Sequence, residues 1–143
     1  MKSWLLFAVV GISLWSCVPD SQLKTLEPYY IFHDNSSKVW LVQHVYKQGK
    51  DFAPLSNKYK DIFTFHHSNY CYVQRMCTFG DEPGRKAYFA LDSETNELRM
   101  EFRQEVWRFN LKFVSPQKII LTPKASNPED MQYTLELIPV PEP

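Results

Sequence analysis

The sequence lacks an excess of charge of either sign. Its 16 lysines and arginines match its 16 aspartates and glutamates, so the formal net charge at pH 7 is zero. Proteins that bind nucleic acids gain much of their affinity from a basic surface, because it releases counterions from the phosphates. No block of like charges occurs either, which argues against an electrostatic tail. We therefore expect no nucleic-acid partner.

The sequence also lacks the short motifs of common catalytic sites. No Gly-x-Ser-x-Gly, phosphate-binding loop or His-Glu-x-x-His pattern occurs. Asp92 and Glu94 are two nearby carboxylates, but they lie in "LDSETNEL", where acidic residues are typical of a turn. We expect neither enzymatic activity nor a cofactor.

Histidines are too few and too poorly spaced to indicate a metal site. His66 and His67 are adjacent, so on a strand they point to opposite faces and cannot chelate one ion together. His44 could approach His66 from a neighbouring strand, and His33 is the fourth histidine of the chain. Solvated or packed histidines are the simpler interpretation, and we expect no metal.

Cysteine is scarce as well: besides Cys17 there are only Cys71 and Cys77. An even pair in an exported protein invites a disulfide. The intervening "YVQRM" has no turn residue, however, and residues six apart on a straight strand lie about 20 Å apart at ~3.3 Å per residue. A disulfide needs Cα atoms within about 7 Å. We favour two free thiols, Cys71 and Cys77, on one face of a strand.

No apolar run is long enough for a membrane-spanning helix, which needs about 20 residues. The longest run, "LLFAVVGISLWSC", extends from Leu5 to Cys17. Lys2 precedes it, the small Ser16 ends it, and polar sequence follows at once. This layout is typical of a secretory signal peptide.

The end of that run, "LWSC", resembles the lipobox of bacterial lipoproteins, although Trp15 is bulkier than usual at its position. The resemblance implies cleavage after Ser16 and attachment of lipid to Cys17, including an acyl chain such as palmitate on the new N-terminus. Several acyl chains on one residue would hold a protein on a membrane. The expected location is the cell envelope, at the outer membrane of a Gram-negative bacterium. The alternative is an ordinary signal peptide that is cut at another bond, with Cys17 incidental.

Removal of residues 1–16 leaves 127 residues with a formal charge of −1, which suits one domain. Residues 17–36 are predicted as a lipid-anchored tether, whose aromatic "YYIF" could pack against the domain, and residues 37–143 as the domain itself. Short alternating runs recur in that domain and predict an all-β barrel or sandwich. The eight expected strands are 38–46, 61–66, 70–79, 85–92, 97–102, 106–113, 118–122 and 132–138.

The clearest alternation lies in residues 97–113 and predicts a hairpin about Gln104 and Glu105. Apolar contacts and opposite charges favour one register, as expected when one face is buried. The expected pairs are Phe102 with Trp107, Met100 with Phe109, Leu98 with Leu111, Glu101 with Arg108, and Glu97 with Lys112. We expect the apolar set, together with Phe113, Leu135 and Leu137, to point inward, and Arg99, Glu101, Arg108 and Lys112 to be exposed.

The pattern "SSKVWLVQHVYKQGK", followed by "FTFHHSNYCYV", "WRFNLKFVSPQKIILTPK" and "YTLELIPV", resembles the lipocalin-like domains of many Gram-negative lipoproteins. The Gly-x-Trp signature of lipocalins proper is broken, since Lys38 stands two positions before Trp40. The resemblance implies an antiparallel up-and-down barrel of about eight strands, with little helix. It implies no particular ligand, because this fold hosts many functions.

Two functions remain open at this point. The first is a non-catalytic structural or accessory lipoprotein whose filled barrel docks on a membrane-associated envelope complex. The alternative is a carrier of a small hydrophobic, fatty-acid-like or lipid-like ligand. Aromatic side chains can fill an eight-stranded barrel or line a cavity in it. Candidate lining residues are Trp40, Met100, Phe102, Trp107, Phe109 and Leu111, and candidate mouth residues are Lys50, Lys58, Tyr59 and Lys60.

Overall fold

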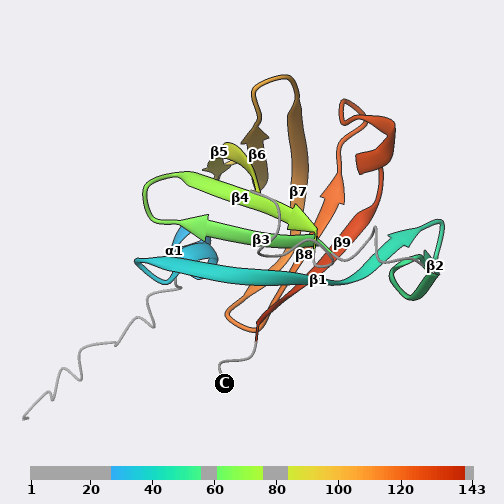
Figure 1. The fold of residues 1–143 in the computed structure, drawn as a ribbon, viewed down its shortest axis with the longest axis horizontal. Helices are drawn as coiled ribbons and strands as arrows, with labels where there is room; N and C mark the ends of the chain where they lie inside the picture. Colours follow the sequence, from blue (N-terminus) through green and yellow to red (C-terminus); the bar gives the residue numbers. More distant parts are fainter. Residues whose placement is uncertain (1–26, 56–60, 76–83, 141–143) are drawn as a thin grey trace, which may run out of the picture.

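Eight antiparallel strands form a closed up-and-down barrel in the computed structural model, which describes residues 27–55, 61–75 and 84–140 (Figure 1). Each strand pairs with the next along the chain, and the last strand pairs with the first to close the barrel. The strands are β1 (Ser37–Lys47), β3 (Asp61–His66), β4 (Tyr70–Arg75), β5 (Arg85–Asp92), β6 (Glu97–Glu101), β7 (Val106–Ser115), β8 (Lys118–Pro123) and β9 (Thr134–Pro139). The predicted all-β class and the meander are confirmed, and the architecture is consistent with a lipocalin-like fold.

Smaller elements extend the ends of the barrel. A short strand β2 (Lys50–Asp51) pairs with the end of β1, and a 3₁₀ turn, η1 (Ala53–Leu55), follows it. Another 3₁₀ turn, η4 (Glu129–Met131), precedes β9. The predicted strand 70–79 corresponds to β4 as far as Arg75, and its remainder lies outside the described residues.

The core follows from the period-two alternation of the strands. In β3, Phe63 and Phe65 are fully buried, and in β7 Trp107 and Phe109 point inward. Of the residues expected to be inward, Leu98, Met100, Phe102, Trp107, Phe109, Leu135 and Leu137 are buried. Arg99, Glu101, Arg108 and Lys112 are exposed, as predicted. One face of each strand therefore builds a single core inside the barrel.

A helix of six residues, α1 (Pro28–His33), closes one end of this core. Pro28 suits the first turn, where no helical partner exists for a backbone N–H. Phe32 is fully buried and its ring meets that of Phe65 edge to face at 4.8 Å. The indole Nε1 of Trp40 donates to the carbonyl of Phe32 at 3.0 Å. The predicted tether, 17–36, thus overlaps a helix whose side chains belong to the core.

The register predicted for the β6–β7 hairpin is wrong by two residues. Met100 pairs with Trp107 and Leu98 with Phe109, while Glu97 faces Asn110. The shift arises in the connection, where residues 102–105 form a four-residue loop closed by a bond from the Phe102 N–H to the Glu105 carbonyl, 2.8 Å. Because a slip of two residues keeps each side chain on its face, the burial of Leu98, Met100, Phe102, Trp107 and Phe109 was predicted correctly although their pairs were not.

A β-bulge explains the second error. Leu111 pairs with Leu121 and Phe113 pairs with Ile120, so Lys112 is an extra residue in β7. One extra residue reverses the faces beyond it. Phe113, which was expected to be inward, is 48 % exposed, and Leu111 is half-buried rather than buried.

Candidate functional site

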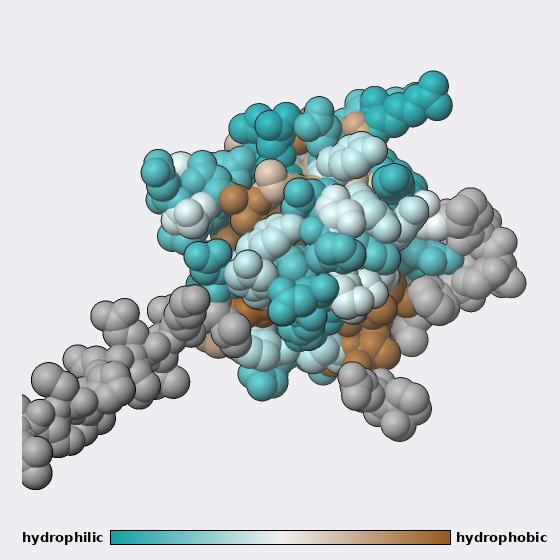
Figure 2. All heavy atoms as spheres, turned by 90° about the vertical axis from the view of Figure 1, so that its left-hand side faces the viewer, coloured by the Kyte–Doolittle hydropathy of each residue, from teal (hydrophilic) through white to brown (hydrophobic). Residues whose placement is uncertain are grey.

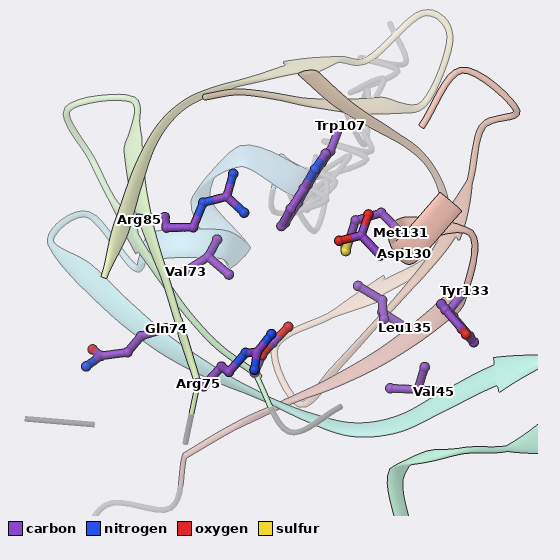
Figure 3. Close-up of a pocket in the computed structure, with 11 residues that line it drawn as sticks. Val45, Val73, Gln74, Arg75, Arg85, Trp107, Asp130, Met131, Tyr133 and Leu135 are labelled. Atoms are coloured by element: carbon purple, nitrogen blue, oxygen red, sulfur yellow. The ribbon is translucent and has the colours of Figure 1, made fainter. Parts of the chain in front are cut away.

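The end of the barrel opposite α1, here called the open end only because α1 does not cover it, contains a pocket of about 220 Å³ (Figure 3). Apolar side chains from strands β1, β4, β7 and β9 and from the turn η4 supply most of its walls. Arg75 and Arg85 reach it from one wall, and Asp130 comes from the opposite wall. Its lining residues are Val45, Asp61, Val73, Gln74, Arg75, Arg85, Trp107, Asp130, Met131, Tyr133 and Leu135.

Strand alternation places three charged residues at this end. Asp61 shares the inward face of β3 with Phe63, and Arg75 shares that of β4 with Val73. Arg85 likewise continues the inward face of β5 that begins with Ala87. Asp61 and Arg75 are direct cross-strand partners. The inward faces of three neighbouring strands therefore end in charged residues at the pocket.

The electrostatics of the pocket centre on Asp61. Burial raises the pKa of this carboxyl to about 6, although the nearby guanidinium groups of Arg75 and Arg85 oppose the rise. Arg85 forms an ion pair with Glu105, and its guanidinium carbon lies 4.6 Å from the ring centre of Phe102. Asp61 can therefore change its charge near neutral pH beside two permanent cations.

Of the residues predicted to line a cavity, Trp107 lines this pocket. The ring of Trp107 is almost wholly buried, and its indole Nε1 has no hydrogen-bond partner among the described residues. Trp40, Met100, Phe102 and Phe109 are buried in the core without lining the pocket, and Leu111 is half-buried.

The predicted mouth residues are not shown to meet at the pocket. Lys50 is exposed on β2, with its ammonium 5.3 Å from the ring centre of Phe52, and does not line the pocket. Lys58, Tyr59 and Lys60 lie outside the described residues. Asp61, Arg75, Arg85 and Asp130 were not among the predicted site residues. For the first three, the inward-facing alternation of their strands was a signal in the sequence that could have identified them.

The histidines lie apart. Ser37, rather than His44, faces His66 across the β1–β3 pair. His44 Nδ1 contacts the carboxylate of Asp51 at 2.6 Å. His33, the last residue of α1, is buried, and burial is the main cause that lowers its pKa. Within the described ranges, no group of three or more histidine, cysteine, aspartate or glutamate residues is placed to hold a metal ion.

The surroundings of Cys71 and Asp92 fit structural roles for both residues. Cys71 is a free thiol buried in β4, and burial raises its pKa, which disfavours the reactive thiolate. Cys77 lies outside the described residues. Asp92 Oδ1 accepts from the backbone N–H groups of Glu94 and Thr95 at 2.9 and 3.2 Å, the turn role expected for it.

A second candidate site lies on the outer wall of the barrel. Outward-facing apolar residues follow one another across five strands, and we call them the outer band: Ile62, Leu41, Ile138, Ile120 and Phe113. Leu41 pairs with Ile62 and Ile138, and Phe113 pairs with Ile120.

The two halves of the outer band meet between β8 and β9. Ile120 faces Glu136, two residues from Ile138, so the two isoleucines are diagonal neighbours. The Lys118–Glu136 ion pair, 3.1 Å, lies beside them. Figure 2 shows a face that is mostly hydrophilic, with hydrophobic atoms gathered in separate places, one of them near its lower edge. Within the outer band Phe113 is exposed, Leu41, Ile120 and Ile138 are half-buried, and Ile62 is buried. A row of apolar side chains across five strands is unusual on the outer face of a barrel.

No helix in the described part of the chain combines the length and apolar character that crossing a membrane requires. The chain matches no family model. A search of curated proteins finds no significant match to it either.

Proposed function

We propose that this protein is a non-catalytic accessory lipoprotein of the cell envelope, whose barrel docks on a membrane-associated protein complex through the outer band. The outer band is the observation that carries the proposal. Phe113 is 48 % exposed and belongs to an apolar surface that extends from β3 to β7 around the closure of the barrel. Phe113 is the exposed member of the outer band; Leu41, Ile120 and Ile138 beside it are half-buried, and Ile62 is buried. A large apolar side chain that is exposed at the end of such a row is typical of interaction sites.

The interior supports the same proposal. Aromatic and aliphatic side chains fill the barrel from α1 to Trp107, and the pocket at the open end has about 220 Å³. Pockets for drug-sized ligands usually have about 300–1,000 Å³. A carrier of fatty-acid-like or lipid-like cargo is the alternative, and the pocket offers less room than such cargo needs.

The proposal includes a lipid anchor at Cys17. The domain begins at α1, and an extended chain from Cys17 to Glu27 reaches at most roughly 35 Å at ~3.3–3.6 Å per residue. A protein tied so closely would meet envelope partners near the membrane surface, at the outer membrane of a Gram-negative cell.

Substitution of the anchoring residue tests this part. Cys17→Ser should move the protein from the membrane pellet to the soluble envelope fraction, or leave the precursor uncut. Intact mass spectrometry of the wild-type protein should show a mature N-terminus that carries acyl chains. A mature N-terminus without them would end the lipoprotein proposal.

Site-specific photo-crosslinking in intact cells tests the docking surface. A photoreactive phenylalanine analogue at position 113 should give one adduct of defined size with an envelope protein. The control position is Tyr88, which is 61 % exposed on β5, outside the outer band. The Ile120→Glu substitution should remove the adduct at 113. The docking proposal is wrong if positions 113 and 88 give the same adducts, or if Ile120→Glu leaves the adduct unchanged.

A further inference from the structure

The pocket at the open end has its own chemistry, which docking through the outer band does not use. Val73, Met131 and Leu135 give it apolar walls, and Trp107 adds the face of an indole ring. The guanidinium groups of Arg75 and Arg85 bring N–H donors to the same space. An apolar cup with a few convergent polar groups is typical of a small-molecule site.

The charges favour an acidic ligand. Arginine presents five N–H donors in a planar fork that fits a carboxylate, so a guanidinium with one acidic partner still has donors for another. Arg85 forms its ion pair with Glu105, and Asp61 lies within electrostatic range of both arginines. Arg75, Arg85 and Asp130 are all exposed, so solvent screens each of these charges, and the two arginines outnumber the one aspartate on η4.

We propose that the open end of the barrel binds a small monocarboxylate with a short apolar body, whose carboxylate lies beside Arg75 and Arg85 and whose body contacts Trp107, Met131 and Leu135. The volume of about 220 Å³ excludes a fully enclosed long-chain fatty acid. A short alkyl acid matches both the size and the division of the pocket into a cationic wall and apolar walls.

Asp61 makes this binding sensitive to pH. Its pKa of about 6 means that it is ionised at pH 7.5 and largely neutral at pH 5.5. The charged groups that face it are Arg75 on β4 and Arg85 on β5, with Asp130 across the pocket on η4. The neutral form removes one negative charge from beside the ligand carboxylate, so affinity should rise as pH falls through this range.

Titration with sodium pentanoate tests the proposal directly. We would follow the tryptophan fluorescence of the full-length protein in nanodiscs, subtract empty nanodiscs, and use Trp107→Phe to identify the signal of Trp107. Pentanoate should bind about tenfold more tightly than pentanamide, since a charge-assisted hydrogen bond exceeds a neutral one by at least that factor. Pentylamine should not bind, and palmitate should not exceed pentanoate.

Variants assign the contacts. Arg85→Gln should weaken pentanoate binding about tenfold, whereas Arg99→Gln, on the outer face of β6, should leave it unchanged. If Arg85→Gln does not fold, Arg75→Gln provides the same test, since it too replaces a cationic donor by a neutral one. Asp61→Asn should keep binding but abolish the gain of at least about threefold between pH 7.5 and 5.5.

Several results would overturn the proposal: no saturable change with pentanoate, equal affinity for pentanamide, preference for pentylamine, or a response that is unchanged in Trp107→Phe. Because none of these measurements involves the outer band, their failure leaves the docking proposal standing, and failure of crosslinking at position 113 leaves this one standing.

Discussion

The two ends of the barrel are filled by different kinds of side chain. At the end that α1 covers, Phe32 fills the opening, and the Trp40 indole satisfies the Phe32 carbonyl with a hydrogen bond of 3.0 Å. At the open end the inward faces finish with Asp61, Arg75 and Arg85 around a pocket. The first arrangement maximises apolar burial, whereas the second places a partly buried carboxylate, Asp61, beside two exposed arginines. The closed end therefore contributes mainly to stability, and the open end is where we propose that a ligand binds.

The largest expected effect on stability comes from a substitution at the closed end. Phe32→Ala should lower the free energy of unfolding by about 3–5 kcal/mol, because it deletes a fully buried ring from between Phe65 and Phe89. Urea denaturation would measure the change. Tyr30→Ala, on the exposed face of the same helix, is the matched control, with an expected loss below about 1 kcal/mol. Similar losses for both variants would mean that α1 is not part of the core.

At the open end, by contrast, we expect a substitution to raise the free energy of unfolding. A folded-state pKa of about 6 for Asp61, above the ordinary aspartate value of 3.8, means that the folded protein binds more protons than the unfolded chain between these values. Stability should therefore fall as pH rises from about 4 to about 6. Asp61→Asn should remove this slope and raise stability at pH 7.5 by about 1–3 kcal/mol.

Asp92 gives the contrasting case. Hydrogen bonds from the Thr95 and Glu94 backbone lower its pKa, so its contribution to stability is lost as pH falls through the folded-state value. Thermal unfolding across pH 3–8 should show Asp92→Asn losing stability at neutral pH while Asp61→Asn gains it. A loss in both variants would contradict the role assigned to Asp61.

The two buried tryptophans refine the comparison. Trp40→Phe deletes a hydrogen bond and leaves the buried Phe32 carbonyl without its donor, which should cost about 1–3 kcal/mol beyond the lost ring area. Trp107→Phe removes an indole N–H that has no partner among the described residues, so its cost should be smaller by at least about 1 kcal/mol. Equal losses of stability in paired chemical denaturation curves would show that the hydrogen bond from Trp40 to Phe32 does not add to stability.

The smallest effect belongs to the outer wall. Phe113→Ser should change the free energy of unfolding by less than about 0.5 kcal/mol, since the ring is 48 % exposed and lies outside the core. Phe109→Ser, four residues earlier and fully buried in the same strand, is its control and should be severely destabilising. A large loss for Phe113→Ser would mean that the ring packs as core does.

Alternation in the sequence predicted the strands and their buried faces because a barrel strand has one solvent-exposed face and one face in the core. It could not choose between hairpin registers two residues apart, since both put Met100 and Trp107 inside; the loop bond from Phe102 to Glu105 decided between them. The bulge at Lys112 left no mark in composition. Helix α1 was missed because six residues are too few to show a helical period, and packing against the barrel stabilises it.

The site was less predictable than the fold. Asp61, Arg75 and Arg85 lie at the ends of recognisable strands and continue their inward faces, but a charged residue at a strand end is ordinarily interpreted as the start of a loop. Their proximity depends on the register of three neighbouring strands, as in the pairing of Asp61 with Arg75. That register is a property of the closed barrel rather than of any one segment.

The pairing of β1 on both sides has a mechanical consequence. β1 follows α1 along the chain and bonds to β3 on one side and β9 on the other. A pull on an N-terminal membrane anchor would first strip α1 from the barrel and then load β1 along its own axis. Two ladders of hydrogen bonds would share that load in shear instead of opening one after another. A barrel tethered in this way should lose its helix under modest tension while its wall stays closed.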